Sequence, residues 1–531
     1  MSAAGTADGP DHVLAVDMGT GTAKVALVSR EGRIAASAMR PIELIQLPGG
    51  AAEQDPEEWW AAVREAAREA IAAAGVAPER VVAVRCASQW AVTVPVDASG
   101  AAIANAISWM DTRGGPHVRK LVGGPLTISG YSPRKLRRWI RSTGGAPVRS
   151  GIDALGHILH LKHDRPEIYA AADKLLEPVD YLNLRLTGRA VASYGSIYPY
   201  WLTDNREVES IDYDPVLLRW TGIDRAKLPE LLPMDAAVGT LLPEVARDLG
   251  LSERTPVLTG LTDLQGAAIG AGAVRKSDGY FSIGTTSWLS CHIGRKKTDL
   301  LHQLATMPSA LPGRHMVVAE QGAAGRCLEF VRDQILFGSG PGDPSPPEDA
   351  FEILESQAAE IPAGSDGLIF TPWVNGVQAP AEDVFTRSAF FNQSLRTTRA
   401  HYARAAMEGV AYNLRWLRDH VERFTKQRFD PLNFIGGAAQ SAVWCQILAD
   451  VLDREVRAVA QPRFANAVGA ALSGFAALGK LEPEQIPATI EIGATYRPEP
   501  DAVAVHDRQF DRFLEIYKRN RRIYRRLNAA A

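Results

Sequence analysis

The sequence predicts an α/β chain built from two similar lobes, and three observations lead to this prediction. The chain has 531 residues, which is more than a single hydrophobic core usually supports. Apolar stretches typical of strands are mixed along the chain with amphipathic stretches typical of helices. A strand–turn–strand pattern with glycine and threonine in its turn occurs once in each half of the chain.

The composition is that of an ordinary globular protein. A net charge of −3 and a pI of about 6.4 give no global attraction to nucleic acid or to an anionic membrane. No stretch is long and apolar enough to cross a bilayer, and residues 1–12 lack the basic and apolar regions of a secretion signal. The cysteines form no CxxC pair, which indicates a reducing compartment; they are Cys86, Cys291, Cys327 and Cys445. We therefore expect a cytoplasmic protein without nucleic-acid or membrane partners.

The first glycine–threonine turn lies near the N-terminus. Residues 14–18 (LAVDM) alternate like a strand, and residues 25–38 are typical of two more strands. Asp17 stands at the end of the first strand, directly before the turn Gly19–Thr22. Glycine suits any tight turn, so the turn has a simple structural explanation. Alternatively, its N–H groups and hydroxyls hold phosphate, and Asp17 faces a metal ion.

The next elements have clear boundary residues. A helix is expected to begin after Asp55, which can cap it, with Pro56 in the first turn, and to end at Gly75. Residues 81–89 are typical of a strand, and a hairpin with its turn at Asp97–Gly100 follows. Residues 338–348 are rich in proline and glycine and predict a surface loop.

The second glycine–threonine turn repeats the pattern of the first. Residues 279–294 (GYFSIGTTSWLSCHIG) predict two strands around a turn at Gly284–Ser287. Two such turns, one from each lobe, can close on one polyphosphate from both sides.

A third glycine pair follows a strand at residues 432–435. Gly436 and Gly437 precede a helix for which Ser441 is a suitable cap. Glycines here let a ligand approach the backbone, and a helix N-terminus favours anions, although close packing of turn and helix explains them equally. Neither GxxxxGK[ST] nor a GxGxxG that opens a βαβ unit is present, so neither a P-loop nor a Rossmann site is supported.

Asp263 is the candidate catalytic carboxylate. It follows a strand that ends at Thr259–Gly260 and precedes a run of small residues. In phosphoryl transfer to an alcohol, a carboxylate can orient the acceptor hydroxyl and take its proton. The alternative is a helix cap, for which aspartate is also favoured.

Two further patterns have simpler explanations than ligand binding. His157, His160 and His163 recur at three-residue steps, but no carboxylate or cysteine obviously completes a metal site. The basic segment Lys518–Arg526 belongs to a stretch with aromatic residues at helical spacing. A packed terminal helix with a solvated basic face is favoured over nucleic-acid binding.

Several segments of the chain, taken together and in their order along the sequence, resemble the FGGY carbohydrate kinases. These segments are AVDMGTGTAK, EQDPEEWW, AISWMDTR, DYLNLRLTG, TDLQGAAIGAGAV, SIGTTSWL and FIGGAAQSAVWCQILADVL. The similarity is strongest to xylulokinases. It implies two ribonuclease H-like lobes of the actin and hexokinase type, with ATP and sugar in a cleft between them. The implied N-terminal lobe spans residues 1–258 and the C-terminal lobe residues 259–531.

The resemblance also implies roles for single residues. Asp17 would lie near Mg²⁺, and Asp263 would contact the sugar and act as the catalytic base. Residues that match the sugar pocket are Gln89, Trp90, Trp109, Asp111 and Arg113. Residues that match the ATP site are Asp17, Gly19, Thr20, Gly21, Thr22, Lys24, Gly284, Thr285, Thr286, Gly436, Gly437, Ala438 and Ser441.

Two departures from the xylulokinase pattern concern the sugar pocket. This chain has Gln89-Trp90-Ala91-Val92 where xylulokinases usually have Gln-Met-His-Gly, and Leu264 where an asparagine usually follows the catalytic aspartate. Ala91 removes a hydrogen-bonding side chain, whereas Trp90 adds bulk and a stacking face. Such a loss changes which sugar fits.

The sequence therefore predicts an ATP- and Mg²⁺-dependent kinase for a sugar or polyol, with D-xylulose, converted to xylulose 5-phosphate, as the leading acceptor. Ribulose, another ketose, a pentitol or a tetritol is the alternative. An actin-like ATPase and a catalytically silent sugar sensor are the rivals from other functional classes. The resemblance also suggests a homodimer.

Overall fold

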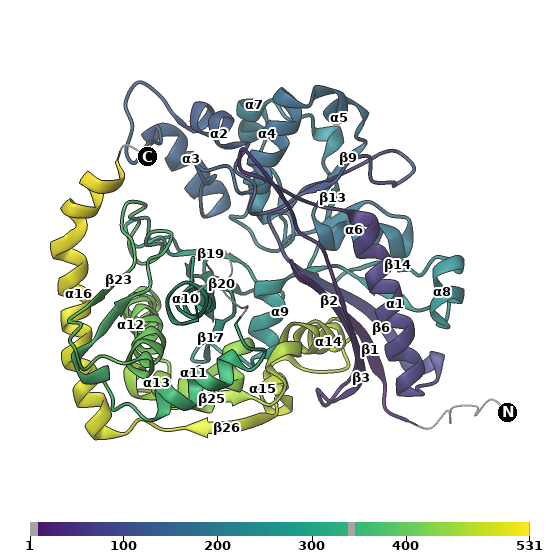
Figure 1. Ribbon diagram of the computed structural model, residues 1–531. Helices are drawn as coiled ribbons and strands as arrows, with labels where there is room; N and C mark the ends of the chain where they lie inside the picture. The colour runs from purple at the N-terminus through teal and green to yellow at the C-terminus, as the bar shows by residue number, and fades with distance from the viewer. Residues whose placement is uncertain (1–8, 338–345, 530–531) are drawn as a thin grey trace.

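The computed structural model describes residues 9–337 and 346–529, and two mixed β-sheets form its frame (Figure 1). The predicted loop at 338–348 thus lies mostly outside the described residues. The first sheet contains, in spatial order, β14 (Ala237–Thr240), β15 (Pro256–Leu258), β6 (Val81–Ser88), β1 (His12–Met18), β2 (Thr22–Ser29) and β3 (Ile34–Pro41), with β16 (Leu261–Thr262) beside β6. The second contains β19 (Ala305–Pro308), β20 (His315–Val318), β18 (Ser287–Ile293), β17 (Gly279–Ile283), β24 (Leu432–Ile435), β25 (Val456–Val459) and β26 (Ile492–Tyr496), with β21 (Glu320–Gln321) beside β18.

The two sheets share one topology. In the first, β1 and β2 form an antiparallel hairpin, and β6 and then β15 run parallel to β1. In the second, β17 and β18 form the hairpin, and β24 and then β25 run parallel to β17. Each series ends on an antiparallel edge strand, β14 or β26. The prediction of two similar α/β lobes is therefore confirmed.

Helices cover both faces of the first sheet. Helix α1 (Pro56–Ala74) packs on one face, and α14 (Ala465–Ala477) packs on the other together with α9 (Asp263–Gly270). The predicted ends of α1 are confirmed, because the Asp55 side chain accepts a hydrogen bond from the Glu57 N–H at 2.9 Å and Gly75 is left-handed.

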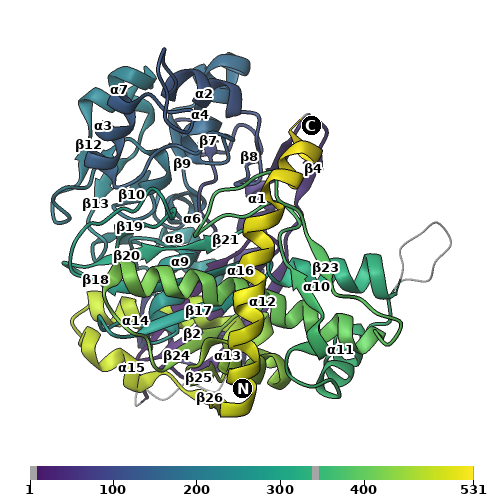
Figure 2. The same cartoon turned by 90° about the vertical axis from the view of Figure 1, so that its left-hand side faces the viewer.

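The core of the second lobe lies between its sheet and a group of helices. These are α10 (Gly325–Val331), α11 (Ala350–Ala359), α12 (Arg399–Thr425), α13 (Ala442–Leu452) and α16 (Pro500–Asn528). Helix α16 runs along the outer side of this lobe (Figure 2) and buries Phe510, Phe513 and Tyr517, so the predicted packed terminal helix is confirmed. No helix in the described ranges is long and apolar enough to span a bilayer.

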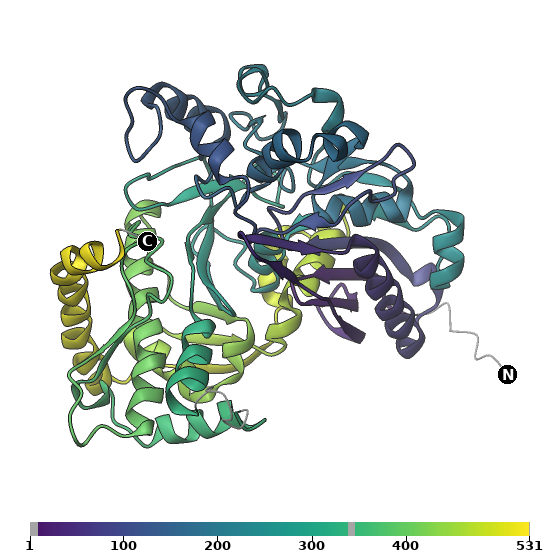
Figure 3. The same ribbon diagram turned by 45° about the horizontal axis from the view of Figure 1, so that its top comes forward.

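The first lobe carries an additional region with its own core, formed by residues between Ile107 and Leu231. Figure 3 shows the two lobes side by side, with the purple strands of the N-terminal lobe on one side and the yellow helix α16 of the C-terminal lobe on the other. The remaining helices are α2 (Gly115–Val122), α3 (Pro133–Thr143), α4 (Ala154–Asp164), α5 (Pro166–Ala171), α6 (Pro178–Thr187), α7 (Pro215–Thr221), α8 (Pro243–Leu249) and α15 (Ile486–Thr489). Small sheets join β4 (Ile45–Leu47), β5 (Ala51–Gln54) and β8 (Ala106–Ile107); β7 (Val94–Val96) and β9 (Lys174–Leu176); β10 (Val191–Ser193) and β13 (Glu230–Leu232); β11 (Thr203–Asp204) and β12 (Asp212–Tyr213); and β22 (Ile369–Thr371) and β23 (Ala389–Phe391).

Helices α9 and α14 cross in the middle of the molecule with their backbones in contact (Figure 1). A Cβ atom added to Gly270 would lie 1.7 Å from the Ala465 carbonyl oxygen, and one added to Gly469 would lie 1.9 Å from the Gly266 carbonyl oxygen. The crossing therefore requires residues without side chains. In the chain α14 lies between β25 and β26 of the C-terminal sheet, but it packs on the N-terminal sheet, so α14 ties the two lobes together.

We predict that Gly270→Ala destabilises the protein by about 1–3 kcal/mol, because the new methyl group must push α14 away from α9. Gly474→Ala on α14 is the matched control, since its Cβ would meet no atom closer than 3.5 Å. Thermal unfolding of both variants checks this. Equal midpoints for the two variants would show that the crossing tolerates a side chain.

Candidate active site

The first glycine–threonine turn connects β1 and β2 and presents Asp17 at its base. The turn is closed by a hydrogen bond from the Gly19 N–H to the Thr22 carbonyl at 3.0 Å. Asp17 is buried, and Lys24 on the paired strand donates to its Oδ2 atom at 2.8 Å. Asn466 at the start of α14 donates to Oδ1 at 3.3 Å. The backbone N–H groups of Thr20 and Gly21 have no partner among the described residues and remain free for an anion.

Thr20 connects this turn to the predicted sugar pocket. Its hydroxyl donates to Gln89 Oε1 at 2.8 Å and accepts from Trp109 Nε1 at 3.0 Å. Gln54 completes the group, since its amide donates to the Thr20 carbonyl at 2.7 Å and accepts from Gln89 at 2.7 Å. The first glycine–threonine turn and the predicted sugar-pocket residues Gln89 and Trp109 thus belong to one hydrogen-bonded cluster.

The side chains of Asp111 and Arg113 bind to each other. Asp111 is buried and accepts from the Ala52 N–H at 3.0 Å and from Arg113 Nε at 2.8 Å. Arg113 also forms an ion pair of 2.6 Å with Glu53. The pair fixes the segment after Trp109 onto β5.

The second turn connects β17 and β18, and its outer residues Gly284 and Thr285 are exposed. The Gly325 N–H, at the start of α10, donates to the Gly284 carbonyl at 2.9 Å and holds the turn in place. Gly436 lies against the end of β17 with φ of 93°, and a Cβ there would lie 2.6 Å from the Ile283 carbonyl. The second turn and the third glycine pair are therefore neighbours.

The predicted boundary around the third glycine pair is confirmed. Gly437 and Ala438 lie in a 3-10 turn, and Ser441 caps α13 by accepting from the Trp444 N–H at 3.1 Å.

Asp263 is the first residue of α9, and it is not the helix cap. Thr262 caps the helix by accepting from the Gln265 N–H, and the Gln265 side chain in turn accepts from the Thr262 N–H at 3.0 Å. The cap interpretation of Asp263 is therefore wrong. Burial raises the pKa of Asp263 to about 7, and the charges of Asp17 and Glu320 add to this rise. The charge of Lys24 opposes it, so both members of the Asp17–Lys24 pair act on Asp263.

Four residues near this site were not identified from the sequence: Gln54, Glu177, Glu320 and Asn466. Burial raises the pKa of Glu320 to about 7 and that of Glu177 well above its usual value. Glu177 directly follows the apolar pair Leu175–Leu176 in the sequence, and this position at the end of a strand is its local signal. The other three reach the site only through tertiary packing, and no local pattern marks them.

The predicted residues Trp90 and Trp109 are both partly exposed. Trp90 stacks on Tyr198 with ring centroids 6.1 Å apart. A planar surface of this kind is suited to the apolar face of a sugar ring or chain.

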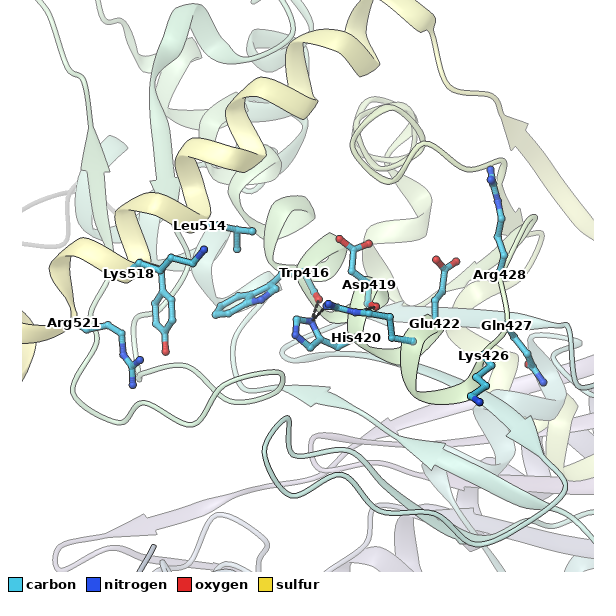
Figure 4. A pocket seen from close by; sticks show the side chains of 12 residues that line it. Trp416, Asp419, His420, Glu422, Lys426, Gln427, Arg428, Leu514, Lys518 and Arg521 are labelled. Atoms are coloured by element: carbon cyan, nitrogen blue, oxygen red, sulfur yellow. Dashed lines mark hydrogen bonds between the residues drawn. The ribbon is translucent and has the colours of Figure 1, made fainter.

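A cavity of about 910 Å³ lies between α12 and α16 (Figure 4). Trp416 and Leu514 line it together with basic side chains such as Lys426 and Lys518. None of the predicted site residues lines this cavity, so it is not the catalytic site.

Comparison with known proteins identifies the family. The model described as "FGGY family of carbohydrate kinases, N-terminal domain" matches residues 12–270, and the corresponding C-terminal model matches residues 279–478. Xylulose kinase from Bacillus subtilis is 26% identical over 510 residues, covering 95% of this chain and 96% of the relative. Gluconokinase from the same organism is 26% identical over 492 residues, covering 92% of each chain.

The fold comparison gives the same result. A solved xylulose kinase structure from Lactobacillus acidophilus superimposes with a TM-score of 0.83 at 21% identity, over 98% of this chain and 100% of the other. Because the superposition covers 98% of this chain, the likeness in fold extends over both lobes. The two family models together match most of the chain, and this chain belongs to the FGGY family of carbohydrate kinases.

Proposed function

We propose that this protein transfers the γ-phosphate of ATP to a hydroxyl group of a ketopentose, with D-xylulose as the first candidate acceptor and xylulose 5-phosphate as the product. The observation that carries the proposal is the position of Asp263. It begins α9, which crosses α14, the helix whose Asn466 binds Asp17. The charges of Asp17 and Lys24 act on it, and burial raises its pKa to about 7. A carboxylate with this pKa is suited to take a hydroxyl proton at neutral pH.

The residues of the two turns fit ATP and Mg²⁺. The free N–H groups of Thr20 and Gly21, and the exposed Thr285, offer donors for phosphate oxygens. Gly436 lets its segment lie directly against the end of β17, where a Cβ atom would collide with the Ile283 carbonyl oxygen, and this keeps the third glycine pair next to the second turn. Asp17 supplies the kind of oxygen ligand that Mg²⁺ prefers, and one or two carboxylates suffice because substrate phosphates complete the coordination. When bound, Mg²⁺ would neutralise charge on the transferred phosphoryl group.

In this proposal Asp263 orients the acceptor hydroxyl, accepts its proton at a carboxylate oxygen and thereby favours attack on the γ-phosphorus. Lys24 balances the charge of Asp17, so that Asp263 faces less repulsion than two free carboxylates would impose. Closure of the lobes would exclude water from the transferred group.

The charges around Asp263 favour a neutral acceptor. Asp17 and Glu320 act on it as negative groups, and the cation that acts on it, Lys24, is already paired with Asp17. An acidic sugar such as gluconate, the substrate in the name of one relative, would meet this negative surround. A ketose or a polyol meets no such repulsion, so ribulose, another ketose, a pentitol or a tetritol is the alternative to xylulose.

Three further expectations belong to this proposal. We propose a division between the lobes at residues 258 and 259, directly before the segment that leads into α9. The cytoplasm is the proposed location, because ATP and sugar metabolites are available there. A homodimer remains the proposed oligomeric state.

We predict that Asp263→Asn lowers kcat by about 10²–10⁴, because the amide cannot accept the hydroxyl proton. The KM for ATP should stay within about threefold, since the turns that would hold ATP are unchanged. Coupled ADP release with Mg²⁺–ATP and D-xylulose measures both. A variant that keeps wild-type kcat would contradict the assignment of Asp263 as the base.

The acceptor itself is tested by the same assay on a panel of D-xylulose, ribulose, pentitols, tetritols, glycerol and D-gluconate. We expect kcat/KM for the best neutral acceptor to exceed that for gluconate by about 100-fold or more, as expected where one ligand must bury an unpaired charge. Preference for gluconate would overturn the charge argument. ATP hydrolysis that no sugar stimulates would favour an actin-like ATPase, and ATP binding without turnover would favour a sensor.

We also predict an acid limb in the pH dependence of kcat/KM. Asp263 loses its function as a base when it is protonated, so activity should fall about tenfold per pH unit below pH 7. Glu320→Gln removes a negative charge that raises this pKa, so it should move the limb to lower pH. Asp97→Asn, in a distant surface turn, is the control and should leave the limb in place. If the pH at which kcat/KM falls were the same in Glu320→Gln as in the wild type, a group other than Asp263 would be responsible for the acid limb.

A further inference from the structure

Glu177 is a buried carboxyl group beside residues 89–92, which we call the sugar wall because two of them match the sugar pocket. It is the last residue before α6 and is 1% exposed. Strand β9, which ends directly before it, pairs with β7, which begins directly after Thr93. This pairing brings Glu177 against the chain that leaves the sugar wall.

One oxygen of Glu177 holds the backbone of the sugar wall. Oε2 accepts from the Val92 N–H at 3.2 Å, and the N–H groups of Val92 and Ala91 both favour its charged form. The other oxygen, Oε1, is buried and has no partner among the described residues. A buried carboxyl group with an unpartnered oxygen is costly, so an apolar side chain would be favoured if only packing mattered here.

The backbone that Glu177 holds is strained. Ala91 has φ of 57°, in the left-handed region that residues with a Cβ atom adopt only at a cost. A bend of this kind persists only when its surroundings fix it. The acceptor supplied by Glu177 to the next N–H group is such a fixing contact.

The bend at Ala91 determines where Trp90 lies. Gln89, on one side of the bend, is held by hydrogen bonds with Thr20 and Gln54. Trp90 stacks on Tyr198, whose hydroxyl reaches the Thr306 carbonyl of the second lobe at 3.3 Å. If the bend relaxed, Trp90 would leave this stack.

The polar groups of the predicted sugar pocket are largely engaged within the protein. Gln89 and Trp109 bond to Thr20, and Asp111 and Arg113 bond to each other. The position of the wall, more than a set of free polar groups, must therefore define how a sugar fits. The charge of Asp263 contributes to the raised pKa of Glu177, so the two carboxyl groups influence each other.

We propose that Glu177 is a positioning residue for the acceptor sugar: it holds the left-handed bend at Ala91 through the Val92 N–H and thereby sets Trp90 against Tyr198. The effect on the KM for the sugar rests on the proposed function. The coupling between Glu177 and Ala91, which the thermal midpoints of the variants measure, is independent of the proposed function.

A double-mutant cycle tests the proposal in the full chain. Glu177→Leu keeps a similar volume but removes the acceptor, and Glu177→Gln keeps an oxygen for the Val92 N–H. Ala91→Gly removes the cost of the bend, because glycine adopts positive φ freely. The four proteins of the cycle are the wild type, Glu177→Leu, Ala91→Gly and the double variant, with Glu177→Gln as the conservative control.

We expect Glu177→Leu to raise the KM for the best sugar about tenfold, with kcat and the KM for ATP within about threefold, since only acceptor placement is lost. Glu177→Gln should resemble the wild type. Adding Ala91→Gly to Glu177→Leu should recover most of the KM and of the thermal midpoint. A residue that merely filled the core would show no such rescue.

The remaining outcomes either overturn the proposal or show that the proposed function alone has failed. The proposal would be overturned if Ala91→Gly restored neither the KM for the sugar nor the thermal midpoint of Glu177→Leu. It would also be overturned if Glu177→Gln were as impaired as Glu177→Leu. If the wild type phosphorylates no sugar, the proposed function fails, and the thermal midpoints still decide the role of Glu177. If Glu177→Leu does not fold, recovery of folded protein in the double variant supports the proposal, and its absence, together with an impaired Glu177→Gln, overturns it.

Discussion

The backbone contact between α9 and α14 is the constraint on which the arrangement of the site depends. Gly270 and Gly469 let the two helices approach until only backbone atoms separate them. Helix α9 begins with Asp263, and α14 begins one residue before Asn466, which binds Asp17. The same crossing therefore sets the relation between the two carboxylates, and the packing of α14 on the N-terminal sheet joins the two lobes. A pair of helices separated by side chains would leave more freedom in that distance, because rotamers can adjust and backbones cannot.

A cluster of acidic groups is costly, and the local structure shows how the cost is limited. Lys24 lies on the strand paired with Asp17, so its ammonium group reaches the carboxylate without a long-range loop. The capping of α9 by Thr262 and Gln265 leaves the Asp263 carboxylate free of a capping role, with one hydrogen bond from the Leu264 N–H at 2.8 Å. Because Thr262 and Gln265 cap the helix, Asp263 accepts few backbone hydrogen bonds and keeps its raised pKa. A larger set of backbone donors would have lowered that pKa. Such destabilised groups are typical of functional sites, where stability is given up for reactivity.

The sequence was informative where local chemistry decides the structure. The two glycine–threonine turns, the cap at Asp55 and the left-handed Gly75 all follow from neighbouring residues, and the duplicated turn also predicted the duplicated lobe. Asp263 illustrates the limit of such reasoning, because threonine and aspartate are both good caps and only the structure shows that Thr262 has this role.

Contacts between distant segments could not be predicted in this way. Gln54 lies 35 residues from Gln89, and Asn466 lies 449 residues from Asp17. For the same reason the sequence did not reveal that Asp111 and Arg113 bind each other and β5. The family resemblance implied which residues form a sugar pocket, but which of their polar atoms remain free depends on packing that a local pattern does not encode.

This distribution of polar atoms has a consequence for acceptor selection. A site that discriminates through hydroxyl partners needs polar atoms that are unpaired before the sugar arrives. In the described part of this pocket, Gln89, Trp109 and Asp111 already have protein partners. What remains is a shaped surface with Trp90 at its edge and a negative charge distribution around Asp263. Shape and charge separate sugars by size and by ionisation more sharply than by the configuration of one hydroxyl. The acceptor specificity proposed for this chain therefore depends on the position of the wall and on the charges around Asp263, and not on the two glycine–threonine turns.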